Sequence, residues 1–69
     1  MIKNAIEQIL NEINSNNVFN LSNVNLKELT RAVREEGASN KSSHQMIKDV
    51  ILDLFDSVGY DKFGIVDAE

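Results

Sequence analysis

Apolar residues recur at helical spacing in three stretches of the chain. The first stretch carries five large aliphatic residues, most of them three or four positions apart: Ile2, Ile6, Ile9, Leu10 and Ile13. This period places them on one face of a helix, and polar residues fall on the opposite face. The pattern predicts a helix over about residues 2–13 with one buried face.

A start signal precedes the second helical stretch. Asn25 is a good N-cap, and Glu28 follows three residues later, as a capping box requires. Val24 can pack on Leu29 as a hydrophobic staple across the same junction. Gly37 predicts the end of the helix, because glycine readily adopts the left-handed conformation found there. The apolar positions in between form one stripe: Leu26, Leu29 and Val33.

The third stretch begins with polar residues and continues as the longest apolar stripe of the chain. Ser42 with Gln45 is a second capping box, and Ser43 is an alternative cap. Gly59 marks the predicted end of this helix. Capping alone accounts for the serines. The stripe consists of Ile47, Val50, Ile51, Leu54, Phe55 and Val58.

Two short segments outside the helices favour extended structure. In residues 18–21, Phe19 and Leu21 fall on one side of a strand; residues 63–66 follow a turn and contain Gly64, which weakens a strand. The two segments either pair as a minimal two-stranded β element or lie unpaired over the core. The predicted fold class is therefore mostly α: a compact three-helix domain over residues 1–69, with a winged-helix-like order of elements.

The length and composition of the chain limit its function. A chain of 69 residues buries a small share of its surface and usually needs a partner or a covalent link for stability. The absence of cysteine excludes disulfides and thiolate chemistry. The longest apolar run is far shorter than the roughly 20 residues of a membrane span, and the first residues lack the apolar region of a signal peptide. We expect a cytoplasmic protein without a membrane partner.

The third helix carries the main candidate for a binding surface. Asp49, Asp53 and Asp56 share one face, about 160° from the centre of the apolar stripe. Leu52 lies about 130° from that centre, and Met46 lies on the other side of the acidic face. The second helix offers a basic stripe at the same spacing: Lys27, Arg31 and Arg34. These residues form either a protein-binding surface or two ordinary solvated faces, with Arg31 paired to Glu35.

The order of elements is similar to the front part of a winged-helix DNA-binding domain, although no residue motif supports the similarity. It implies that the third helix reads DNA with residues 40–48. The residue types suited to base edges and phosphates are Asn40, Lys41, Ser42, His44, Gln45 and Lys48. The net charge of −4 and the three aspartates of that helix oppose this alternative.

Catalytic chemistry finds little support in the sequence. His44 has no cysteine to activate, and its two serine neighbours do not face it on a helix. No glycine-rich phosphate loop or cluster with metal-ligand spacing occurs, so we expect no enzyme activity, cofactor or metal. The sequence predicts a small protein-binding regulator or inhibitor that uses the third helix, either as a homodimer or with a foreign protein. Its size and composition fit an accessory protein of a phage or other mobile element.

Overall fold

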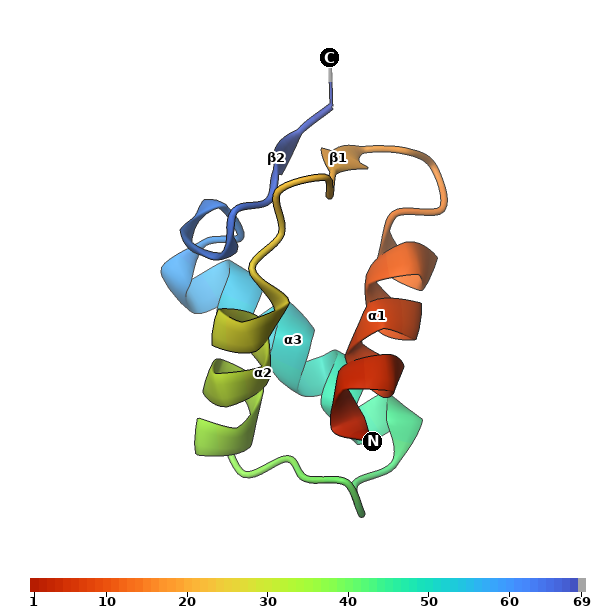
Figure 1. The fold of residues 1–69 in the computed structure, drawn as a ribbon, viewed down its shortest axis with the longest axis vertical. Coiled ribbons are helices and arrows are strands. Elements are labelled where there is room, and N and C mark those ends of the chain that lie inside the picture. The colour runs from red at the N-terminus through yellow and green to blue at the C-terminus, as the bar shows by residue number, and fades with distance from the viewer. Residues whose placement is uncertain (69) are drawn as a thin grey trace.

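The computed structural model describes residues 1–68; residue 69, the last of the predicted single domain, lies outside the described residues. Helices α1 and α2 run in opposite directions, and α3 crosses behind both of them (Figure 1). The elements in chain order are α1 (Ile2–Ile13), β1 (Phe19–Asn20), α2 (Leu26–Glu35), α3 (His44–Val58), the 3₁₀ turn η1 (Asp61–Phe63) and β2 (Val66–Asp67). The predicted mostly helical fold with a two-stranded element is confirmed.

Helix α1 has the predicted bounds and the predicted buried face. Met1 occupies its N-cap position without a side-chain capping bond. The amide of Ile2 instead donates a hydrogen bond to Asn40 Oδ1, 2.9 Å away. A side chain from the α2–α3 connection therefore satisfies one of the free amides that begin a helix.

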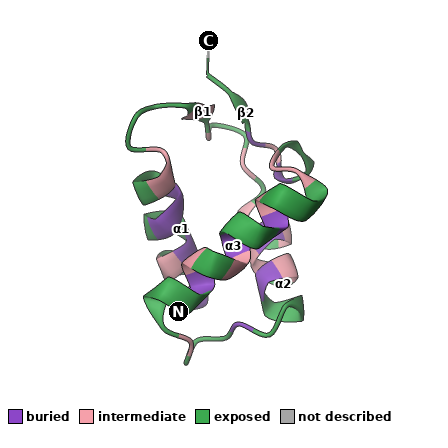
Figure 2. Cartoon of the chain, turned by 180° about the vertical axis from the view of Figure 1, so that it is seen from behind, coloured by how far each residue is buried: buried purple, intermediate pink, exposed green. Residues whose placement is uncertain are grey.

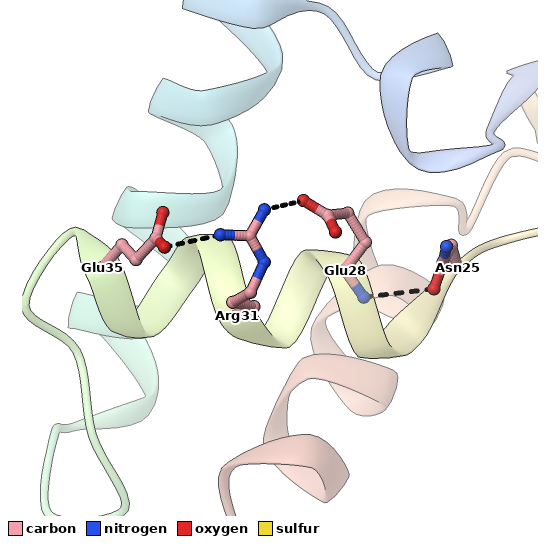
Figure 3. Close-up of polar contacts among 4 residues, drawn as sticks. All are labelled: Asn25, Glu28, Arg31 and Glu35. Atoms are coloured by element: carbon pink, nitrogen blue, oxygen red, sulfur yellow. Dashed lines mark hydrogen bonds and ion pairs between the residues drawn. The ribbon is translucent and has the colours of Figure 1, made fainter.

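Helix α2 begins at the predicted cap, but only half of the capping box forms. Asn25 Oδ1 accepts a hydrogen bond from the Glu28 amide at 3.1 Å (Figure 3). The Glu28 carboxylate does not return the bond, because it pairs with Arg31. The amide of Asn25 donates to the carbonyl oxygen of Phe63 instead, at 2.8 Å. The start of α2 is thus tied to η1.

The N-cap of α3 lies one residue later than the first predicted cap. Ser43 is the N-cap, and its Oγ accepts from the Met46 amide at 3.1 Å. The prediction of Ser42 as the cap is wrong, because Ser42 Oγ accepts from the Ser39 amide at 2.9 Å. Ser43 was the alternative cap in the sequence pattern. Gly59 ends the helix as predicted, with φ of 86°.

The two extended segments pair in an antiparallel sheet, although the second strand lies later than predicted. Phe19 pairs with Asp67, and Asn20 pairs with Val66. The predicted segment 63–66 is only partly a strand, because residues up to 63 form η1 and Gly64 is left-handed, with φ of 80°. A Cβ at Gly64 would collide with the carbonyl oxygen of Asn23, so the chain can pass there only as glycine.

The core lies between the three helices and is closed by residues that follow α3. Figure 2 shows buried positions on the inner sides of the helices and exposed positions along the outer side of α3. None of the helices in residues 1–68 is both long and apolar enough to cross a membrane. The core residues are Ile2, Ile6, Ile9, Leu10, Leu29, Val33, Ala38, Ile47, Ile51, Leu54, Phe63 and Ile65.

Candidate functional site

The predicted residues of α3 lie together on its exposed side. We call this surface the α3 outer face; it consists of Met46, Asp49, Leu52, Asp53 and Asp56, all exposed. At 100° per residue these five positions fall within an arc of about 120°, nearly opposite the buried stripe. The three carboxylates occupy the middle of the arc. Leu52 on one flank is 43% exposed, and Met46 on the other is 44% exposed.

Two of the three carboxylates of the α3 outer face have no polar partner within residues 1–68. Asp49 accepts a hydrogen bond from the side chain of Gln45 at 2.9 Å. Asp53 and Asp56 form no salt bridge or side-chain hydrogen bond within residues 1–68. The face therefore presents unneutralised negative charge between two apolar side chains. Such a surface suits a partner that offers both cations and apolar contacts.

A second candidate surface is lined by residues of α1 and α2 and by none of α3. A hollow of about 620 Å³ is lined by Lys3 of α1 and by five residues of α2: Lys27, Thr30, Arg31, Arg34 and Glu35. We call it the basic hollow. In Figure 1, α1 and α2 lie in front of α3, whereas in Figure 2 α3 is nearest the viewer. The helices that line the basic hollow, α1 and α2, thus lie on one side of the molecule, and α3 lies on the other.

Arg31 is engaged within its own helix. Its guanidinium pairs with Glu28 and Glu35, one turn away on either side (Figure 3). The hydrogen bond and charge of Glu28, followed by the charge of Glu35, raise the pKa of Arg31. The local pairing with Glu35 that the sequence left open therefore forms. Within residues 1–68, Lys3, Lys27 and Arg34 form no salt bridge.

Thr30 leaves one polar atom of the basic hollow unsatisfied. Its hydroxyl oxygen Oγ1 is buried and has no hydrogen-bond partner in the described part of the chain. A buried hydroxyl without a partner is uncommon in folded proteins. Because this oxygen is buried, it is not presented to a molecule in the hollow, and the cations are the groups that the hollow offers.

The residues of the alternative DNA-reading surface are mostly used inside the fold. Asn40 accepts from the first amide of α1, and Ser42 accepts from the Ser39 amide. His44 Nε2 lies 3.0 Å from Glu12 Oε2. Lys48 Nζ lies 3.8 Å from the other oxygen of Glu12.

Gln45 and Lys41 are the remaining residues of the alternative DNA-reading surface. Gln45 is bonded to Asp49, whereas Lys41 is exposed and its side chain forms no ion pair in residues 1–68. The structure also brings Glu12 of α1 into the middle of this surface, which the sequence did not indicate. A carboxylate at that place opposes the approach of phosphate.

The sheet offers little to an added strand along β1. The side chain of Asn14 occupies the outer edge of β1: Oδ1 accepts from the Phe19 amide at 2.7 Å, and Nδ2 donates to the Phe19 carbonyl oxygen at 3.0 Å. An asparagine amide thus replaces a neighbouring strand and blocks pairing there.

Groups of three or more metal-ligating side chains are absent from residues 1–68. A comparison with known protein families, curated proteins and solved structures finds no match for this chain. We therefore infer its function from the chemistry of the α3 outer face and the basic hollow.

Proposed function

We propose that this chain is a small non-enzymatic regulator or inhibitor that binds another protein through the α3 outer face. One observation carries the proposal: Leu52 and Met46 are exposed on either side of three carboxylates, two of which have no partner in residues 1–68. Methionine is enriched at protein interfaces, and polar side chains form the rim of such surfaces.

The chemistry of the face indicates the kind of partner. Its negative charge favours a protein surface with lysine or arginine side chains and disfavours nucleic acid and anionic lipid. Leu52 and Met46 supply apolar area, and methionine adapts to irregular surfaces. An accessory protein of a mobile element that acts in the cytoplasm by occupying a host protein fits this description.

The DNA-binding alternative has weaker support. Lys41 is exposed and could contact phosphate, but Asn40, Ser42, His44 and Gln45 already make hydrogen bonds or polar contacts within the fold. A reading helix would also have to carry Asp49 toward the DNA. We therefore place DNA binding second.

The first experiment compares two variants with the same change in net charge. Immobilised wild-type protein is used to capture partners from a lysate of the source organism, identified by mass spectrometry. The double variant Asp53→Asn with Asp56→Asn should capture about tenfold less of the partner. Each exposed charge contributes up to about 1 kcal/mol, and about 1.4 kcal/mol is a factor of ten.

Glu7→Gln with Glu36→Gln is the matched control, since both residues are exposed and lie on α1 and at the end of α2. It should retain the partner. Equal capture by all three proteins would exclude the α3 outer face. Tight, sequence-dependent binding to a DNA duplex that is lost in Lys41→Ala would replace the proposal with the DNA alternative.

A further inference from the structure

The cations of the basic hollow and the carboxylates of α3 have the same arrangement along their helices. Lys27 and Arg34 are seven residues apart, as are Asp49 and Asp56. Seven residues of helix span about 10 Å, so the charges of one set can meet those of the other along their length. The charges are opposite, and neither pair is neutralised by a salt bridge within residues 1–68.

The apolar parts of the two surfaces also match. The basic hollow is lined largely by lysine and arginine. The aliphatic stems of these residues can cover apolar surface while their charged ends stay in water. Leu52 and Met46 flank the carboxylates of α3 and would lie on these stems.

We infer that the basic hollow of one copy of this chain receives the α3 outer face of a second copy. The inference rests on the proposed function, because it assigns a second use to the same α3 face. A face that is covered by a neighbouring copy is closed to a foreign protein. Self-association therefore lowers the amount of regulator that is free to act.

The position of the two surfaces determines the type of assembly. The helices that line the basic hollow lie on one side of the molecule and α3 lies on the other (Figures 1 and 2), so a contact between two copies leaves one α3 face and one basic hollow free. Such a heterologous contact does not close on itself, and further copies can add at both ends. The expected product is an open row of copies.

Sedimentation velocity and light scattering of the purified wild-type chain give the first test. At about 0.01 M salt the mean mass should rise with protein concentration and pass beyond that of a dimer. At about 1 M salt the mass should return to that of the monomer, because the screening length falls from about 30 Å to about 3 Å. A monomer at all concentrations, or a mass that stops at the dimer, overturns the inference.

Complementary variants give the second test. The hollow variant, Lys27→Gln with Arg34→Gln, removes two cations without introducing carboxylates and keeps a working α3 face. The face variant, Asp49→Lys with Asp53→Lys, keeps a working basic hollow. Each alone should stay monomeric, and an equal mixture should form a species of two copies that grows no further. A mixture that remains monomeric contradicts the head-to-tail contact.

A matched control separates a specific contact from attraction between net charges. Glu7→Lys with Glu36→Lys has the same net charge as the face variant but leaves α3 intact. Its mixture with the hollow variant should grow beyond two copies, because the control can still bind to itself, whereas addition of the face variant should stop that growth. If the assemblies reach the same mass whether or not the face variant is added, the inference is overturned. Circular dichroism verifies the fold of each variant. Where a double variant unfolds, the single variants Lys27→Gln and Asp53→Lys repeat the test.

The two proposals fail in different experiments. If the wild-type chain does not self-associate but still captures a foreign protein, only the inference about a second copy is overturned. If the mean mass rises with concentration, but the wild type and the double variant Asp53→Asn with Asp56→Asn capture equal amounts of the foreign protein, only the proposed function is overturned.

Discussion

Three asparagine side chains complete the backbone hydrogen bonding of three separate elements. Asn14 covers the edge of β1, Asn25 caps α2, and Asn40 accepts from the first amide of α1. Asn14 uses both the donor and the acceptor of its amide group, whereas Asn25 and Asn40 each accept through Oδ1. Only the role of Asn25 could be predicted from the sequence, since it acts within its own helix. Asn40 acts on a residue 38 positions away, and only the tertiary fold brings the two together.

Tyr60 provides a prediction at the scale of a single residue. Its hydroxyl donates to Asp67 Oδ1 at 2.6 Å, and its ring packs edge-on against Phe19, with centroids 4.8 Å apart. The hydrogen bond with Asp67 raises the pKa of Tyr60, because it favours the neutral phenol. Asp67→Ala should therefore lower the pKa of Tyr60 toward its ordinary value.

The chain has one tyrosine and no tryptophan, so the ultraviolet absorbance of tyrosinate reports this group alone. The pKa of Tyr60 is higher in the folded chain than in the unfolded chain, where it is about 10. The contact with Asp67 therefore stabilises the fold fully at pH values below the unfolded pKa. That stabilisation is lost as the pH rises through the folded pKa. Asp53→Asn is the control and should leave the titration unchanged. An ordinary pKa for Tyr60 in the wild type would show that the hydrogen bond does not persist in solution.

At the scale of elements, α2 depends on its own cap and on a residue after α3. The Asn25 side chain satisfies the Glu28 amide, while the Asn25 amide is satisfied by Phe63. Substitution Asn25→Ala removes the first bond and leaves the second, so it should cost about 1 kcal/mol of unfolding free energy.

Chemical denaturation followed by circular dichroism measures this cost. Asn16→Ala is the control, because Asn16 is exposed and its side chain makes no hydrogen bond within residues 1–68. The amide of Glu28 should also exchange faster in Asn25→Ala than in the wild type. Equal stability and equal exchange would mean that the cap contributes nothing to α2.

The sequence predicts elements well where the signals are local. The period of the apolar residues sets the bounds of α1, and glycine marks the end of α3. The choice between Ser42 and Ser43 could not be made, since both can cap and a bond to Ser39 decides between them. The second strand was misplaced because Phe63 and Ile65 both enter the core, which a strand pattern does not distinguish from one face of a sheet.

The candidate site, too, has one part that the sequence predicts and one part that it does not. Helix geometry alone predicts that Leu52 and the three aspartates share an exposed face, and the residues do lie there. The basic hollow could not be predicted, because Lys3 joins it from another helix. The contact between Glu12 and His44 likewise joins residues 32 positions apart. Such contacts depend on how the helices cross, which periodicity does not specify.

At the scale of the whole molecule, stability depends on a small core. Ile51 lies in the middle of α3 and has no exposed surface. Ile51→Ala should lower the free energy of unfolding by about 2–5 kcal/mol, because it removes buried apolar area and leaves a cavity. A small domain has about 5–15 kcal/mol in total, so this loss is a large fraction of its stability.

Leu52→Ala is the matched control, since it sits next to Ile51 in the same helix and is 43% exposed. Thermal melts of dilute protein at high salt keep self-association out of the comparison. The melting temperature should fall strongly for Ile51→Ala and little for Leu52→Ala. Equal effects would contradict the orientation of α3 in the fold.

The hydrogen bond from Asn25 to Phe63 has a consequence for the chain as it is synthesised. Translation adds about 5–20 residues per second, so Phe63 is made about 2–7 s after the first turn of α2. During that interval α2 lacks a partner for its cap amide, and the core lacks Phe63 and Ile65. A chain that is released before residue 65 therefore leaves its apolar stripes open to chaperones and proteases. Folding of this domain can be completed only after that point of synthesis.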